Sequence, residues 1–210
     1  MGMLTDTEIE AFRDEGRIVI EPFNPENLSG TSYDLTLGPW FWRRREYRSP
    51  PDMYSGDQSE RFKLVDARAD GGEIVLAPLE SVLAHTNEVA GGWDRIHTEI
   101  RATSTAGRND ITACRCAGFG DPGYVNIWTL EVQNCGQSPL RLRVGSIIAQ
   151  IVFRTVLAKP RRVYGREIGR YAQGLSLEKA DEIRAAWRPE NMLPKPVKVR
   201  DDWRGLWSDR

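Results

Sequence analysis

The feature that most constrains the fold is a series of short, strand-like runs with no long helical segment between them. They are RIVIEPF at 17–23, SYDLTLGPWFW at 32–42, EIVLAPLESVLAHT at 73–86, YVNIWTLEVQN at 124–134 and LRLRVGSIIAQIVF at 140–153. Gly, Pro, Asn and Asp separate the runs at close spacing, which is typical of antiparallel sheets. Alternating βαβ units would need helices between the runs. The sequence therefore predicts a mainly β fold, an antiparallel barrel or sandwich.

The N-terminus predicts a short helix. Thr5 and Glu8 have the spacing of a capping box, Ile9 provides an apolar position after it, and Gly16 ends the segment. Residues 49–72 are polar and contain Pro and Gly, so they predict a long loop.

The C-terminal part predicts a second helix. Ser176 is a suitable N-cap, and Ile183 and Trp187 share one helical face with other apolar residues before a proline ends the segment. We therefore expect one domain over residues 1–174, and a helix with an irregular arm over 175–210 that packs on the same or a neighbouring subunit.

Composition limits the range of partners and compartments. The chain has 210 residues, a net charge of −1 and an isoelectric point near 6.2, which argues against nucleic acid and membrane surfaces as partners. No apolar run approaches the ~18 residues of a membrane span. Three cysteines occur without a secretory signal, so we expect a reducing, cytoplasmic location.

Residues 118–134, GFGDPGYVNIWTLEVQN, contain the letters G-x-G-x-x-G of a dinucleotide-binding loop. That loop must open a helix whose N-terminus holds the pyrophosphate. Here Pro122 lies inside the motif and a β pattern follows it. The stretch is better interpreted as a turn that leads into a strand.

The sequence lacks residues that two other classes of enzyme require. His97-Thr-Glu99 resembles half of the zinc-deaminase motif, but the P-C-x-x-C half is absent and only Cys114-x-Cys116 is present. We therefore predict no zinc site. A serine hydrolase is disfavoured because the chain has no G-x-S-x-G elbow.

The segment RATSTAGR at 101–108 suits an anion. Ser104 and Thr105 offer adjacent hydroxyls and N–H groups, Gly107 permits close approach, and Arg108 supplies a guanidinium. Glu131 is the one carboxylate within the strand-like run that follows the glycine-rich turn. Together they form a candidate site for a phosphate or an oxyanion.

Several segments, taken in order from about residue 5 to 174, resemble the dCTP deaminases of the trimeric dUTPase-like superfamily. The segments are DTEIEAFRDEGRIVIEPF, SYDLTLG, STAGR, DPGY with TLEVQN, PLRLRVGSIIAQIVF and YGREIGRYAQG. The resemblance implies a distorted antiparallel β-barrel or jelly-roll of the dUTPase-like type, with a short N-terminal helix. It also implies a homotrimer with sites between subunits, so that Arg108 and Glu131 of one site come from different chains.

The resemblance further implies zinc-independent hydrolytic deamination of dCTP to dUTP with release of ammonia. Glu131 would be the general base and acid, and Ser104 would hold the attacking water with the carbonyl of Ala117. Arg108 would orient Glu131 and stabilise the intermediate.

The remaining implied contacts concern substrate binding. Thr129 and Leu130 would contact the base, and Asp121 would accept the 3′-OH of the deoxyribose. The triphosphate would be bound by residues from two segments: Thr103, Ser104 and Thr105, and Tyr164, Arg170 and Gln173. Mg²⁺ would be bound through the triphosphate and not by protein side chains.

Departures from the family pattern leave three further functions open. Thr103 and Phe119 stand where basic residues are usual, and Arg101 and Arg115 are the nearby cations. A dUTP pyrophosphatase or a bifunctional enzyme would use Asp121 to activate water. A non-catalytic nucleotide sensor would bind the nucleotide without turnover. A deaminase of a modified or less phosphorylated cytosine nucleotide would fit the changed wall at Cys114–Cys116.

Overall fold

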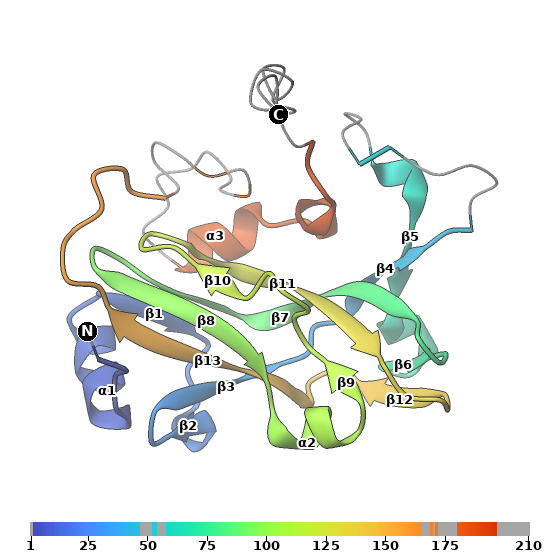
Figure 1. The fold of residues 1–210 in the computed structure, drawn as a ribbon, viewed down its shortest axis with the longest axis horizontal. Helices are drawn as coiled ribbons and strands as arrows, with labels where there is room; N and C mark the ends of the chain where they lie inside the picture. The colour runs from blue at the N-terminus through green and yellow to red at the C-terminus, as the bar shows by residue number, and fades with distance from the viewer. Residues whose placement is uncertain are drawn as a thin grey trace, which may run out of the picture.

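The computed structural model describes residues 2–46, 52–53, 58–164, 169, 171 and 180–196 (Figure 1). One sheet has the strand order β5-β4-β7-β11-β9, with β1 also paired to β7. Its strands are β1 (Ile18–Glu21), β4 (Trp40–Arg44), β5 (Phe62–Asp66), β7 (Ser81–Gly92), β9 (Ile111–Thr112) and β11 (Val125–Asn134).

The second sheet has the order β10-β8-β13-β3-β2. A separate two-stranded sheet pairs β12 with β6. These strands are β2 (Leu28–Ser29), β3 (Ser32–Thr36), β6 (Glu73–Leu76), β8 (Ile96–Ala102), β10 (Phe119–Gly120), β12 (Leu140–Arg143) and β13 (Ile147–Thr155). Every pairing between these strands is antiparallel.

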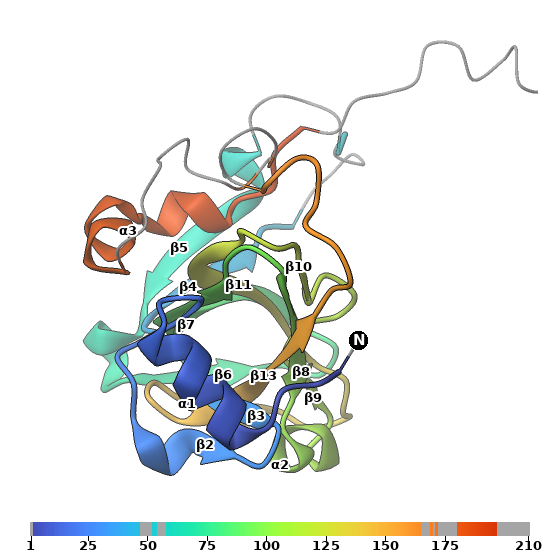
Figure 2. The ribbon, with the colours of Figure 1, turned by 90° about the vertical axis from the view of Figure 1, so that its left-hand side faces the viewer.

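The core lies between the two sheets, and the strands wrap around it as a distorted barrel (Figure 2). Tyr33, Phe41, Leu130 and Phe153, which come from four strands of both sheets, are fully buried. Burial of such side chains is the main force that holds the two sheets together. The mainly β, antiparallel fold predicted from the sequence is confirmed.

The predicted N-terminal helix is present as α1 (Asp6–Asp14). The N–H of Thr5 donates to Oε2 of Glu8 at 2.8 Å, as a capping box requires. Ile9 is buried against the barrel, and Gly16 takes a φ of +71°, a conformation that costs glycine little.

The C-terminal helix is described as α3 (Ala180–Ala186), followed by the 3₁₀ turn η4 (Pro189–Met192). Ile183 and Trp187 are buried, as the shared helical face predicted. The predicted N-cap Ser176 lies outside the described residues. The helix lies against β11, β7 and β1 (Figures 1 and 2).

The predicted long loop over 49–72 is wrong in its second half. That half contains η2 (Ser59–Arg61), β5 and η3 (Ala67–Asp70), and β5 pairs with β4 from Trp40↔Asp66 to Arg44↔Phe62. β5 is an edge strand, so its exposed positions tolerate polar residues while Phe62 is buried. Its composition therefore resembled that of a loop.

The structure also contains strands that the sequence analysis did not identify. β8 is the longest of them, with Ile96 and Ile100 buried and Arg101 exposed. Within the described residues, no helix is long and apolar enough to cross a membrane.

Candidate active site

Strand β11 carries Thr129 and Glu131 on one face, directly after a local irregularity in its pairing. Its register against β7 shifts between Ile127 and Thr129, and the N–H of Trp128 donates to Oγ1 of Thr86 at 3.0 Å. A bulge of this kind redirects the side chains beyond it, and alternate residues of a strand share a face.

The glycine-rich stretch before β11 is a turn, as the sequence indicated. It joins β10 to β11, and a strand follows it where a dinucleotide loop would open a helix. Gly123 has a φ of +97°, and a Cβ there would come within 2.6 Å of the carbonyl oxygen of Tyr164. Glycine is therefore required for the turn to pass beneath Tyr164.

A cavity of about 310 Å³ brings together five of the predicted site residues. Ala117, Asp121, Thr129, Glu131 and Tyr164 all line it. Leu130, which was expected near the base, has a side chain that is fully buried in the barrel core.

Glu131 has the properties of a proton-transfer group. Its side chain is half-buried, and its Oε2 atom is buried without a hydrogen-bond partner among the described residues. Burial raises the pKa of Glu131 above its usual range, partly opposed by the positive charge of Arg115. A buried carboxylate oxygen without a partner is costly, so its presence points to a ligand.

Aromatic side chains form one wall of this cavity. Tyr124 packs edge-on against Trp128 at 4.7 Å and against Tyr164 at 5.3 Å between ring centroids. Burial, followed by the charges of Tyr164 and Glu131, raises the pKa of Tyr124. The wall lowers the local polarity around Glu131, which strengthens electrostatic effects in the site.

Two contributions to the cavity were missed from the sequence. Arg44 of β4 lines it, and so do four residues near the C-terminus of the described chain. These four are Trp187, Asn191, Met192 and Pro194. They reach the cavity through long-range packing, for which the local sequence gives no signal.

The other half of the predicted site lies on α2 (Ser104–Arg108). Thr103 is its N-cap, and its Oγ1 accepts from the N–H of Ala106 at 3.2 Å. Ser104, Thr105 and Arg108 are exposed, and they are not among the residues that line the cavity of Glu131. α2 lies at the opposite edge of the barrel from α3 (Figure 1).

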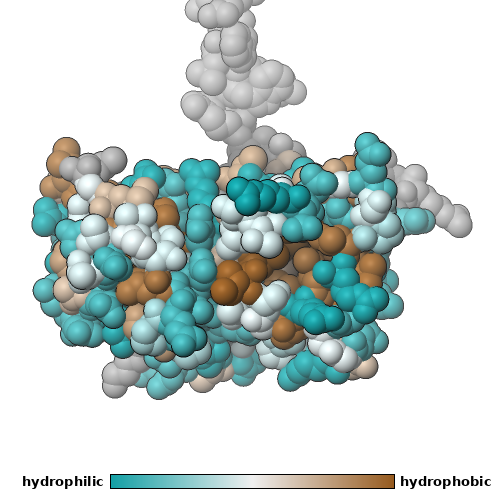
Figure 3. All heavy atoms as spheres, turned by 90° about the horizontal axis from the view of Figure 1, so that it is seen from below, coloured by the Kyte–Doolittle hydropathy of each residue, from teal (hydrophilic) through white to brown (hydrophobic). Residues whose placement is uncertain are grey.

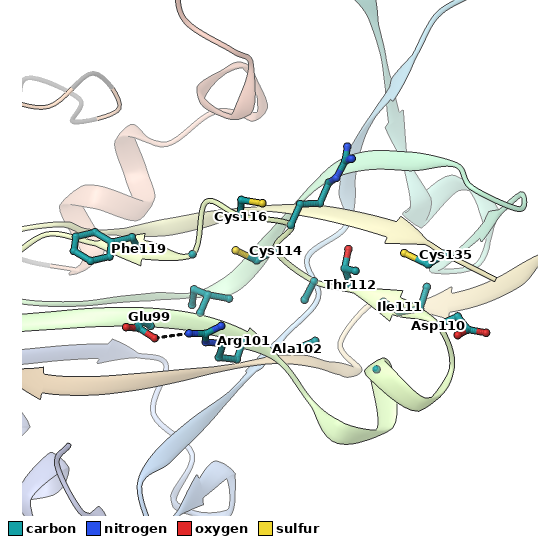
Figure 4. Close-up of a pocket in the computed structure, with 15 residues that line it drawn as sticks. Glu99, Arg101, Ala102, Asp110, Ile111, Thr112, Cys114, Cys116, Phe119 and Cys135 are labelled. Carbon is teal, nitrogen blue, oxygen red and sulfur yellow. Dashed lines mark hydrogen bonds and ion pairs between the residues drawn. The ribbon is translucent and has the colours of Figure 1, made fainter.

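A second cavity of about 550 Å³ lies on the other side of residues 114–119 (Figure 4). Cys114, Cys116 and Cys135 line it, together with Arg101 and Arg115. Burial and then the nearby charge of Glu131 raise the pKa of Cys114 to about 11, which keeps this thiol protonated.

The half-motif His97-Thr-Glu99 lies on β8 at the edge of this second cavity. Glu99 accepts from Nη2 of Arg101 at 2.9 Å and pairs with Arg154 at 3.3 Å. The exposed ring of Phe119, which lines both cavities, packs on His97 at 4.2 Å. In the described part of the chain, no three His, Cys, Asp or Glu side chains are arranged to hold a metal ion.

A third hollow lies beside α2, on the face seen from below in Figure 3, where hydrophobic side chains gather between polar ones. It measures about 490 Å³. Its apolar lining comes from β9, β12, β13 and the residues between them, and includes Ile111, Leu140, Leu142, Ile147 and Ile148.

Two predicted substrate-binding residues, Arg170 and Gln173, lie outside the described residues. Tyr164, their expected neighbour, is described, and its Oη accepts from the N–H of Tyr171 at 3.3 Å. Tyr171 also lines the cavity of Glu131.

Comparison with known proteins agrees with this architecture. Residues 3–156 match the family described as dCTP deaminase-like. The chain is 33% identical to a "dCTP deaminase, dUMP-forming" of Methanosphaera stadtmanae, over 80% of this chain and 86% of the relative. It is 31% identical to a "dCTP deaminase" of Haloarcula marismortui, over 86% of this chain and 94% of the relative.

Among solved structures, the fold is similar to that of 2′-deoxycytidine 5′-triphosphate deaminase from Agrobacterium tumefaciens. The TM-score is 0.57 at 22% identity, and the match covers 74% of this chain and 48% of the other. The chain thus spans about half the length of that protein.

Proposed function

The chain belongs to the dCTP deaminase-like family, and we propose that it catalyses the hydrolytic deamination of dCTP at the cavity of Glu131. The observation that carries the proposal is the half-buried carboxylate of Glu131, which lines the cavity of about 310 Å³ and whose buried Oε2 has no hydrogen-bond partner in the described chain. In the reaction, a C4–O bond forms from water and the C4–N4 bond breaks, with ammonia as the leaving group.

Glu131 serves as both base and acid in this proposal. Its carboxylate takes a proton from the attacking water and returns it to N3 of the cytosine, so that N4 can leave after a further proton transfer. Burial raises the pKa of Glu131, which makes its carboxylate a stronger proton acceptor and suits this double role. Ala117 lines the same cavity, which supports a role for its carbonyl oxygen in accepting a hydrogen bond from the attacking water.

The substrate contacts divide between two surfaces. Thr129 contacts the base and Asp121 the deoxyribose hydroxyl, since both line the cavity. Because the side chain of Leu130 is buried in the core, only its backbone is available to the base.

Ser104 and Arg108 complete the site from a neighbouring subunit. The exposure of α2 and its separation from the cavity within one chain support this arrangement. The apolar hollow beside α2 is a suitable surface for subunit packing in a homotrimer. There Ser104 holds the attacking water, and Arg108 orients Glu131 and stabilises the negative charge of the intermediate.

The triphosphate binds Thr103, Ser104 and Thr105 of α2 and the segment that carries Tyr164, Arg170 and Gln173. Mg²⁺ is held mainly through the phosphates and offsets their charge, which is how proteins usually bind this ion.

A second candidate is a bifunctional enzyme that forms dUMP by also releasing pyrophosphate. Relatives whose names include "dUMP-forming" favour it, and Asp121 lines the same cavity as Glu131. In that enzyme Asp121 activates a water against the α-phosphate.

One assay separates these functions. The purified protein is incubated with dCTP, dCMP or dUTP and Mg²⁺, and ammonia and pyrophosphate are measured. Ammonia alone from dCTP supports the deaminase, and equal amounts of ammonia and pyrophosphate support the dUMP-forming enzyme. Pyrophosphate from dUTP without ammonia from dCTP would contradict deamination. If no nucleotide yields either product, the remaining function is that of a non-catalytic nucleotide sensor.

A further inference from the structure

Residues 180–196 are a fixed part of the barrel surface. Ile183, Trp187 and Met192 are buried in one cluster with side chains of β4, β7 and β11. Nε1 of Trp42 donates to the carbonyl oxygen of Pro189 at 2.8 Å. A guanidinium nitrogen of Arg184 donates to the carbonyl oxygen of Glu21 at 2.7 Å. The segment is thus attached by apolar burial and by hydrogen bonds to two different strands.

This attachment brings the segment to the wall of the cavity that holds Glu131. The ring of Trp187 lies 4.7 Å from that of His85 on β7, which pairs with Thr129 in the sheet. Asn191 and Met192 follow in the turn and line the same cavity. One wall of the site therefore comes from residues beyond the family match, which ends at residue 156.

Asn191 is the polar residue of this wall, and its amide is held in one orientation. Oδ1 of Asn191 accepts from the N–H of Arg188 at 2.6 Å, which caps the turn. Its Nδ2 has no acceptor among the described residues. The fixed oxygen leaves two N–H donors for a molecule in the cavity.

A second amide shows the same arrangement on the facing strand. Asn126 of β11 is 7% exposed and lines the cavity, and its Oδ1 accepts from the N–H of Ile127 at 2.9 Å. Its Nδ2 likewise has no acceptor in the described chain. Asn126 is thus a second amide whose oxygen is held by the backbone and whose N–H donors are available to a molecule in the cavity.

From this geometry we infer that Asn191 is a specificity-determining residue, whose Nδ2 donates to an oxygen of the bound nucleotide. The inference rests on the proposed function, because it assigns a further contact at the same cavity. Among the described residues that line this cavity, Arg44 carries the one positive charge. Neutral amide donors thus supply much of the hydrogen bonding to acceptors of the ligand.

The test uses two substitutions that distinguish the amide oxygen of Asn191 from its N–H donors. Asn191→Asp keeps the oxygen that caps Arg188 and removes the donor, whereas Asn191→Ala removes both. Binding is measured by calorimetry in the Glu131→Gln background, which prevents turnover. Gln137→Glu, the same type of exchange at an exposed position outside the cavity, is the matched control.

We expect both Asn191 variants to bind dCTP about tenfold more weakly, equivalent to about 1.4 kcal/mol, with no change in the control. Asn191→Asp should keep the melting temperature of its parent, because the cap is retained. Deoxycytidine carries no phosphate, so weaker binding of deoxycytidine assigns the acceptor to the base or sugar. Weaker binding of dCTP alone, in both variants, assigns it to the phosphates.

Other outcomes overturn the inference. Unchanged affinity in both variants would show that Asn191 is only a cap, while the proposed function would stand. Weakening of dCTP binding in Asn191→Asp alone would reflect charge repulsion and would also refute the donor role. If the Glu131→Gln parent binds no cytosine nucleotide, the proposed function and this inference fail together.

Discussion

The two halves of the candidate site differ in what surrounds them. On β11 and the turn before it, Thr129 and Glu131 line a cavity with aromatic walls, and burial raises the pKa of the carboxyl. On α2, Ser104 and Arg108 are exposed. This difference supports the proposal that the site is completed between two chains. One chain supplies the half-buried carboxylate, and α2 of a second chain covers it.

The largest effect is expected from the buried half. Glu131→Gln keeps the size of the side chain but removes the proton acceptor, so kcat for ammonia release should fall by about 10³-fold. Retention of the melting temperature would exclude unfolding as the cause. Glu60→Gln, at an exposed position that is not part of the cavity lining, should leave the rate unchanged. A Glu131→Gln protein with a substantial rate would refute the role of this carboxylate.

Next to the buried half, His85 of β7, which pairs with Thr129, should contribute strongly to the response of the protein to acid. His85 is buried between Trp40 and Trp187, and burial lowers its pKa to about 4 from 6.5. Below pH 6.5 the unfolded chain therefore binds this proton more readily than the folded chain, so stability is lost as the pH falls from 6.5 toward 4. The loss from this group can reach about 3 kcal/mol.

Urea unfolding at pH 7, 6, 5 and 4.5 measures this loss. His85→Gln should be less stable at pH 7, because the imidazole Nε2 accepts from the N–H of Trp40 at 3.3 Å. Its stability should fall less steeply than that of the parent between pH 6.5 and 4.5. Parallel curves for the two proteins would show that His85 does not control the acid response.

Activity lost by a substitution in the exposed half should be recovered when a second chain supplies the missing residue. Arg108→Ala removes the guanidinium that we propose orients Glu131, and we expect about a 10²-fold loss of kcat. When Arg108→Ala and Glu131→Gln subunits are mixed and reassembled, about a quarter of the inter-subunit sites regain both side chains. Mixtures that stay inactive, although hybrid oligomers form, would place both residues in one chain.

Much of the fold was predictable because its signals are local. The capping box predicted α1, and runs of β-branched and aromatic residues predicted most of the strands. β8 was missed although Ile96, Thr98 and Ile100 alternate with polar residues, as a half-exposed strand requires. β5 was missed because an edge strand is paired on one side only and can be nearly as polar as a loop.

The site was predictable only where one segment carries it. Residues 117–131 follow each other along the chain, so the turn and strand that hold Asp121 and Glu131 could be inferred together. Arg44 and Asn191 reach the same cavity from distant segments, and only the packing of Trp187 and its neighbours brings them there. Such contacts have no periodicity or motif in the sequence.

The smallest effect tests whether the buried half is strained when its ligand is absent. The unfolded carboxyl of Glu131 has an ordinary pKa near 4.5, and the folded value is raised by burial. Between these two values the folded chain binds more protons, so this group lowers stability as the pH rises.

Glu131→Gln removes the buried charge and should be more stable than the parent at pH 8, by on the order of 1 kcal/mol. The gain should shrink as the pH falls toward 4.5, and Arg108→Ala, in the exposed half, should show no such trend. If Glu131→Gln is no more stable than the parent at pH 8, the unpaired oxygen is not a source of strain, and the contrast between the two halves lies in geometry alone.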